Sequence, residues 1–391
     1  MQPDFSALDD YLADVDADGY LVDAASDDST QRYVSGFDAP DPFFTLYTPD
    51  GTYLLVSGLE YGRAKKEARA DEVRRGSDFD MREKMQEYGR YEAEARARAE
   101  FLAEYDVESV VTPRRFPLGS ADELRDLGVD VEAETEDVVT TIRAVKQDEE
   151  IEHVRQAQKA NERAMQAAEE LVADADVVDG VLHHEDEPLT SERVKEEIEV
   201  TLLREGCALD ETIVACGTDA ADPHNRGSGP LDANEPIIVD IFPRNKATKY
   251  HADMTRTFCK GDPSETVREW YDLTHEALDA ALAAVEPGAT GEDVHDAACD
   301  VYEDAGLPTL RDDPTTETGY IHSTGHGVGL DVHELPHVST NGAELKAGHV
   351  ITVEPGLYDP DVGGVRIEDL VVVTEDGYEN LTDYPIELVV G

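Results

Sequence analysis

Short apolar segments separated by turn residues predict strands in the first part of the chain. Residues 43–47 and 53–56 are rich in aromatic and β-branched side chains, and Pro49-Asp50-Gly51 between them is a typical turn sequence. This pattern predicts a β-hairpin. The spacing of apolar residues also predicts an amphipathic helix over residues 5–12 and a strand at residues 20–22.

A long charged stretch follows, and then a second group of short elements. Residues 61–105 combine Ala, Glu and Arg at helical spacing, which predicts one solvated helix. A strand, a helix and a strand are expected over residues 107–111, 121–127 and 129–131. We therefore expect a smaller α/β domain over residues 1–145.

The pattern changes after residue 145, where helices alternate with β-rich segments. One helix is predicted from residues 145–149 to about Val172, and a second after Pro188 with Thr190 or Ser191 as its N-cap. Further helices are expected over residues 265–285 and 291–305. The β-rich segments are short and strongly apolar; they are residues 212–216, 236–242, 250–258, 349–353 and 364–373. Helices interleaved with antiparallel hairpins favour an α+β domain over residues 146–391.

The charge of the chain excludes several classes of partner. Its 391 residues include 89 Asp and Glu against 33 Lys and Arg, a formal net charge of −56. A surface this negative repels nucleic acids and anionic membranes, so we expect neither as a partner. At about 1 M salt the Debye length falls to ~3 Å and such repulsion is screened. We therefore expect a halophilic protein from a saline cytoplasm, with an unusually soluble acidic protein as the alternative.

The remaining composition favours a cytoplasmic location. The four cysteines have no paired short spacing, which argues against a disulfide framework or a zinc ribbon. The first ten residues, MQPDFSALDD, are acidic and lack the basic and apolar regions of a signal peptide. No apolar segment approaches the ~20 residues that span a membrane. We expect a soluble cytoplasmic protein.

Two pairs of carboxylates are expected to face each other across hairpins. If the hairpin over residues 237–258 folds at its centre, Asp240 lies opposite Asp253. Folding the last hairpin in the same way sets Glu354 opposite Glu368, and both lie in apolar segments, ITVEPG and VRIEDLVVV. Like charges so placed are destabilising unless a cation lies between them. For each acid alone, an exposed position on an amphipathic strand is the alternative.

Histidines favour metal over arginine as the source of that positive charge. The segment IHSTGHGVGLDVHELP, residues 321–336, carries His322, His326 and His333 among three glycines. Four carboxylates need four positive charges, which two divalent cations supply. An oxygen-dominated ligand set favours Mn²⁺ over Zn²⁺, Co²⁺ or Fe²⁺. Two such ions ~3.5–4 Å apart can share a bridging hydroxide and polarise a carbonyl for hydrolysis.

Five motifs in a fixed order resemble those of a known family. They are VDIFP, HADMTRTF, GHGVGLDVHELP, ITVEPG and GVRIED. Together they resemble the pita-bread metallopeptidases, which include methionine aminopeptidases, prolidases, aminopeptidase P and the metal-free creatinases. The match covers about residues 150–391, and the first domain is similar in size and α/β character to the amino-terminal domain of the prolidase, aminopeptidase P and creatinase branch. This resemblance implies a pita-bread catalytic domain, a small peptide substrate and a homodimer.

The resemblance also implies a set of metal ligands. Asp240 would bind one metal, and Asp253 and Glu368 would bridge both. His326 would be the nitrogen ligand of the second metal. Glu354, also on that metal, would accept the proton of the attacking water.

Four further residues match positions that contact the substrate or characterise one branch. His333 resembles the histidine that donates to the substrate carbonyl, and His224 the one that contacts the substrate amide. His322 and Arg366 match the Xaa-Pro branch. The histidines outside the motifs are expected to be structural or on the surface; they are His153, His183, His184, His275, His295, His337 and His349.

The chain departs from the family pattern at two places. Phe242-Pro243 stands where a glycine is common, and the loop to Asp253 is longer than in many relatives, which should alter the rim of the site rather than its metals. His251 lies two residues before Asp253 and so on the same strand face. We expect it to be a hydrogen-bonded neighbour rather than a sixth ligand.

Three functions remain open at this point. The first is a dinuclear-metal peptidase that hydrolyses Xaa-Pro bonds at the amino termini of peptides or dipeptides. The second keeps the fold and metals but hydrolyses a small non-peptide amide of the compatible-solute type. The third is a catalytically dead binding protein. It predicts lost ligands, whereas all five are present.

Overall fold

A six-stranded mixed sheet forms the centre of the first of two compact units, which divide between Arg143 and Ala144. The computed structural model describes residues 3–391. The strand order is β4-β3-β2-β1-β5-β6. The elements as far as the unit border are α1 Ser6–Asp14, β1 Gly19–Ala24, α2 Ser29–Ser35, β2 Phe43–Thr48, β3 Gly51–Val56, α3 Tyr61–Glu67, β4 Glu72–Arg75, the 3-10 helix η1 Gly76–Phe79, α4 Met81–Tyr88, α5 Arg90–Glu104, β5 Ser109–Thr112, α6 Leu118–Asp126, β6 Asp130–Ala133 and α7 Val138–Ala144. The predicted hairpin is present as β2 and β3.

The single helix predicted over residues 61–105 is wrong. The segment forms α3, β4, η1, α4 and α5, and β4 pairs in parallel with β3. Gly89, with φ at 81°, separates α4 from α5 in a backbone conformation that favours glycine. In β4 only Val73 is buried, so the strand carries too little apolar pattern to stand out from the charged residues around it.

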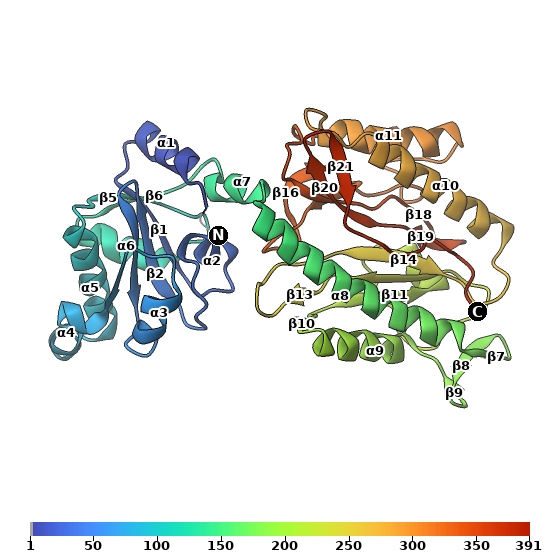
Figure 1. The fold of residues 1–391 in the computed structure, drawn as a ribbon, viewed down its shortest axis with the longest axis horizontal. Coiled ribbons are helices and arrows are strands. Elements are labelled where there is room, and N and C mark those ends of the chain that lie inside the picture. Colours follow the sequence, from blue (N-terminus) through green and yellow to red (C-terminus); the bar gives the residue numbers. More distant parts are fainter. Residues whose placement is uncertain (1–2) are drawn as a thin grey trace. The chain divides into compact units, whose positions relative to one another are not determined.

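The second unit holds its strands between two helix pairs, α8 Asp148–Ala173 with α9 Ser191–Arg204 and α10 Glu265–Ala283 with α11 Gly291–Asp304 (Figure 1). The Thr190 hydroxyl accepts a hydrogen bond from the Arg193 N–H, which is the predicted N-cap. The other elements are β7 Asp176–Val178, β8 Val181–His184, β9 Glu187–Pro188, β10 Cys207–Ala208, β11 Thr212–Cys216, η2 Gly217–Ala221, β12 Ile237–Ile241, β13 Arg244–Asn245, β14 Met254–Phe258, β15 Gly325–Gly327, β16 Glu334–Val338, β17 Val350–Val353, β18 Gly356–Asp359, β19 Gly363–Arg366, β20 Asp369–Thr374 and β21 Gly377–Asn380.

Two apolar cores fix these helices to the strands. Helices α8 and α9 pack on β11, β12 and β14 through residues such as Met165, Ile198 and Val239. Helices α10 and α11 pack on β17 and its neighbours through residues such as Leu278 and Ile351. Since side chains alternate along a strand, polar residues between the core positions face away from the helices. Within residues 3–391, no helix is long and apolar enough to cross a membrane.

Candidate active site

The first carboxylate pair comes from a hairpin whose register differs from the predicted one. In the β12–β14 ladder, Asp240 lies opposite Thr255 and not opposite Asp253. The predicted pairing is wrong by two residues, because the hairpin is centred between Ala247 and Thr248, one residue beyond the midpoint of Asp240 and Asp253; Arg244 in the loop pairs with His251 in this same register. A shift of two keeps side chains on the same face. Asp240 and Asp253 therefore still line one cavity.

The second carboxylate pair lies in a hairpin with the predicted register. β17 pairs with β20 so that Val353 lies opposite Asp369, and β18 pairs with β19 in the same register. The predicted strand over residues 364–373 is thus divided into β19 and β20. Glu354 and Glu368 occupy the gap between the two ladders. The Glu354 N–H donates to the Thr324 carbonyl oxygen at 2.8 Å, and the Glu368 N–H donates to the Thr255 carbonyl oxygen at 3.1 Å. These bonds fix both acids against neighbouring segments.

Four predicted ligands converge around His326. One potential ligand atom each from Asp253, His326 and Glu368 lie within 4.8 Å of one another. The His326 Nε2 is 3.7 Å from the Asp253 Oδ2 and 3.5 Å from the Glu354 Oε1. Asp253, Glu354 and Glu368 are three of the four carboxylates that the sequence singled out, so these acids and the imidazole share one site.

His326 is oriented to offer a lone pair to this cluster. Its Nδ1 lies 3.1 Å from the Gly327 carbonyl oxygen, which can only accept a hydrogen bond. The proton therefore sits on Nδ1 and leaves Nε2 unprotonated. Burial lowers the pKa of His326 to about 3, so the ring is neutral at physiological pH.

If all four carboxylates were ionised, they would carry more negative charge than Arg366 beside them balances. Burial, reinforced by the neighbouring acids, raises the pKa of Asp253 and Glu368 well above their usual range, and burial raises that of Glu354 to about 8. The Oδ1 of Asp240 is buried without a hydrogen-bond partner. An orphaned carboxylate oxygen, a neutral imidazole and three further acids fit a divalent metal site with mainly oxygen ligands.

Arg366 organises one side of the cluster from a buried position. Its Nη2 donates to the Asp240 Oδ2 at 2.5 Å, and its Nε donates to the Thr255 hydroxyl at 3.2 Å. That hydroxyl donates in turn to the Glu368 Oε2 at 2.7 Å. Arg366 thus holds the Oδ2 of Asp240 and leaves its Oδ1 without a hydrogen bond.

Tyr358 joins Arg366 to His322, and sequence reasoning missed it. The Tyr358 hydroxyl accepts from the Arg366 Nη1 at 2.9 Å and lies 3.0 Å from the His322 Nε2. The His322 Nδ1 lies 2.7 Å from the Ser323 carbonyl oxygen and so carries the ring proton. Burial lowers the pKa of His322 to about 3. Tyr358 lies in β18, and the two residues that it joins come from other segments, so no sequence signal marked it.

A cavity of ≈ 830 Å³ opens over the carboxylates, and all nine predicted site residues line it, with His224 and His333 in its wall. The rings of His326 and His333 lie 4.3 Å apart. His337, which the sequence placed among the structural or surface histidines, also lines this cavity and lies opposite His326 in the β15–β16 ladder. Only the pairing of β15 with β16 brings it there, so no sequence signal marked it.

Of the two departures from the family pattern, Phe242 lines the cavity and His251 does not. Phe242 lines the cavity, and the guanidinium of Arg226 lies 5.7 Å from the centre of its ring. His251 is bound through its backbone, since its N–H donates to the Gly329 carbonyl oxygen at 2.8 Å. Its Nδ1 is buried without a hydrogen-bond partner, and burial lowers its pKa to about 4.

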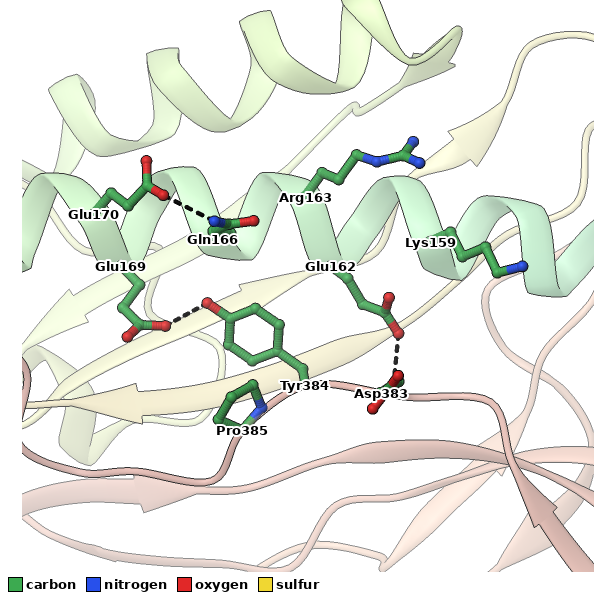
Figure 2. A pocket seen from close by; sticks show the side chains of 9 residues that line it. All are labelled: Lys159, Glu162, Arg163, Gln166, Glu169, Glu170, Asp383, Tyr384 and Pro385. Atoms are coloured by element: carbon green, nitrogen blue, oxygen red, sulfur yellow. Dashed lines mark hydrogen bonds between the residues drawn. The ribbon is translucent and has the colours of Figure 1, made fainter.

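A second cavity, of ≈ 490 Å³, lies between α8 and the segment after β21 (Figure 2). Its acids are engaged with structural partners: the Tyr384 hydroxyl donates to Glu169, and the Asp383 N–H donates to Glu162 at 2.7 Å. This cavity ties the carboxy-terminal segment to α8, and we assign it no chemistry.

Comparison with known proteins identifies both parts of the chain. The model of metallopeptidase family M24 matches residues 152–375, and that of the Creatinase/Prolidase N-terminal domain matches residues 5–156. An Xaa-Pro dipeptidase of Pyrococcus furiosus is 33% identical over 65% of this chain and 67% of its own length. An Xaa-Pro dipeptidase of Pyrococcus horikoshii is 29% identical over 91% of both chains.

Solved structures show the same fold over nearly the whole chain. The crystal structure of the prolidase from Pyrococcus horikoshii has a TM-score of 0.79, 26% identity and coverage of 98% of both chains. An Xaa-Pro dipeptidase from Bacillus anthracis has a TM-score of 0.82 and covers 99% of both chains, at 23% identity. The predicted α+β pita-bread fold with a smaller amino-terminal α/β domain is confirmed.

The fold and the buried carboxylate and imidazole cluster together define a metal-dependent peptidase. The chain belongs to metallopeptidase family M24.

Proposed function

We propose that this protein is a dinuclear-metal peptidase that hydrolyses Xaa-Pro bonds at the amino termini of peptides or dipeptides. The observation that carries this proposal is the set of four carboxylates, three of them buried, and one neutral imidazole that line a cavity of ≈ 830 Å³. The names of the two Pyrococcus relatives, both Xaa-Pro dipeptidases, support the substrate class.

Five residues would hold two divalent ions, with Mn²⁺ favoured by the hardness of the donor set; they are Asp240, Asp253, His326, Glu354 and Glu368. Divalent cations supply Lewis acidity, which polarises a carbonyl oxygen and lowers the pKa of water.

The surrounding side chains would handle protons and charge on the substrate. One oxygen of Glu354 would accept the proton of the attacking water. His333 and His224, in the cavity wall, would donate hydrogen bonds to the substrate carbonyl oxygen as it gains negative charge. Arg366 orients Asp240, and its link through Tyr358 fixes the His322 ring against one wall.

Assays on matched substrates test this function. Purified protein at high KCl with Mn²⁺ should release alanine from Ala-Pro or Ala-Pro-Ala and act poorly on Ala-Ala. Activity on both proline peptides would indicate an aminopeptidase, and activity on Ala-Pro alone a dipeptidase. Absence of metal-dependent alanine release from either substrate would contradict the proposal, and turnover of a small non-peptide amide instead would support the alternative hydrolase.

Removing the metal should destabilise the protein more near pH 8 than near pH 5. In the metal-free folded chain the pKa of Glu354 is about 8, and the pKa values of Asp253 and Glu368 are also raised. In the unfolded chain carboxyl pKa values are about 4, so these three acids bind protons more tightly in the folded state. Their contribution to stability is therefore present below about pH 4 and is lost as pH rises through the folded-state values. Cations bound by the same carboxylates would replace these protons. Calorimetry of EDTA-treated and Mn²⁺-loaded protein should show the wider gap in Tm near pH 8, whereas an equal gap at both pH values would contradict the assignment.

The net charge of −56 supports a further proposal, that the protein is adapted to a saline cytoplasm. Raising KCl from about 0.1 M to about 1 M shortens the Debye length from ~10 Å to ~3 Å and screens repulsion among surface acids. The Tm should therefore rise with KCl, and sucrose of equal osmolality is the control. A Tm that stays constant or falls would contradict salt adaptation.

A homodimer, as the resemblance implies, can be tested by light scattering in the same buffers.

A further inference from the structure

A buried ion pair lies behind the active-site wall, away from the proposed metal ligands. The Lys146 Nζ donates to the Glu334 Oε2 at 2.6 Å, and the two side chains are only 1% and 2% exposed. Of the residues that the structure describes, those lining the large cavity do not include either partner. The pair therefore cannot act by touching a substrate held in that cavity.

The backbone of Lys146 is fixed to the strand that leads to Glu354. The Lys146 N–H donates to the Gly348 carbonyl oxygen at 2.9 Å, and the preceding residue, Val145, forms a β-bridge with His349. Strand β17 begins at the next residue and ends just before Glu354. One end of the ion pair is thus attached to the part of the unit that carries a proposed metal ligand.

The carboxylate of Glu334 organises the turn that carries His333. Its Oε1 accepts from the Asp331 N–H at 2.9 Å, and the Gly329 N–H donates to the Asp331 carbonyl oxygen at 3.0 Å. A Cβ at Gly329 would lie 2.5 Å from the Glu334 Oε2, so the turn closes over this carboxylate only because residue 329 is glycine. The last residue of the turn before Glu334 is His333, which enters the cavity wall.

A buried carboxylate that loses its cation must rearrange to reach water or another donor. Because Glu334 is held by its own turn, such a rearrangement would move the turn and with it His333. We propose that Lys146 and Glu334 are positioning residues, which act through the turn at residues 329–334 to fix the His333 imidazole over the site.

Crystal structures of the wild type and the Glu334→Gln variant test the positioning without any substrate. Gln keeps the size of the side chain and can accept from the Asp331 N–H, but it removes the charge that pairs with Lys146. We expect the His333 ring to shift or lose order while the ligand side chains stay in place. An unchanged His333 would overturn the proposal, whatever the substrate proves to be.

Kinetics on Ala-Pro provide the second test, which rests on the proposed peptidase function. Lys146→Met should lower kcat about tenfold or more, with KM and bound metal changed little. The reason is that a misplaced His333 would stabilise the transition state less while substrate binding stays nearly the same. In a His333→Ala background the same change should have less than about a twofold effect, since the group it positions is absent. Lys146→Arg, which keeps the charge, should restore part of kcat.

Equal losses in both backgrounds would overturn the positioning role. If Lys146→Met does not fold, Glu334→Gln replaces it in the same cycle. If the variants lose activity only in proportion to their unfolded fraction, the pair serves folding alone and the proposal is also wrong. A wild type without Ala-Pro activity would contradict the proposed function, while the crystal comparison would still decide the inference.

Discussion

The Asp253→Asn variant is expected to lose at least about 10³-fold in kcat/KM on Ala-Pro, because the cations that this carboxylate would share supply several kcal/mol of transition-state stabilisation. Asparagine has nearly the same shape but removes one negative charge from the buried cluster. The variant should therefore also bind less metal per chain. Steady-state assays and elemental analysis of the same preparation measure both effects.

The matched control for this variant is Asp304→Asn. Asp304 is exposed at the end of α11, so its replacement removes the same charge without touching the carboxylate cluster. Activity and metal content should both stay at the wild-type level. Wild-type metal content and activity in Asp253→Asn would show that Asp253 is not a ligand.

The Arg366→Met variant is expected to unfold at lower urea concentration, with about 3–5 kcal/mol less stability in the second unit. Arg366 is only 3% exposed, and its loss leaves Asp240 with an uncompensated buried charge and Tyr358 without a donor. The hydrogen bonds that set the direction of Asp240 are lost as well. Activity should therefore fall even where the protein remains folded.

Arg366→Lys separates charge from geometry. Lysine keeps the positive charge but cannot reproduce the planar guanidinium, which contacts Asp240, Thr255 and Tyr358 through three different nitrogens. We expect intermediate stability and a clear loss of kcat. Urea unfolding at fixed Mn²⁺ measures the first, and wild-type values for both would show that the fork geometry is not needed.

The apolar segments around the acids allowed much of the site to be predicted. Glu354 and Glu368 lie in segments whose flanking residues are almost all buried, and the short turn between β18 and β19 leaves one symmetric way to fold them. The register followed from that symmetry. In the first hairpin the same construction failed, because the strands and the Arg244–His251 bridge are centred between Ala247 and Thr248, one residue beyond the midpoint of Asp240 and Asp253. Symmetry predicts register only when the centre of the turn is known to the residue.

Other features depend on contacts that the linear pattern does not contain. Strand β4 has one buried residue, Val73, and charged neighbours, so only its pairing with β3 makes it a strand. His337 enters the site because β16 places it opposite His326. Tyr358 gains its role from Arg366 and His322, which come from separate segments. Each of these requires knowledge of which strands meet.

The two apolar cores of the second unit have a consequence for how it would unfold. Asp240 and Asp253 belong to the hairpin that packs on α8 and α9, whereas Glu354 and Glu368 flank strands that pack on α10 and α11. Ions held by acids from both sides would cross-link the two halves without a covalent bond. Metal loading would then merge their unfolding into one cooperative transition, and chelation would allow one half to open while the other remains folded.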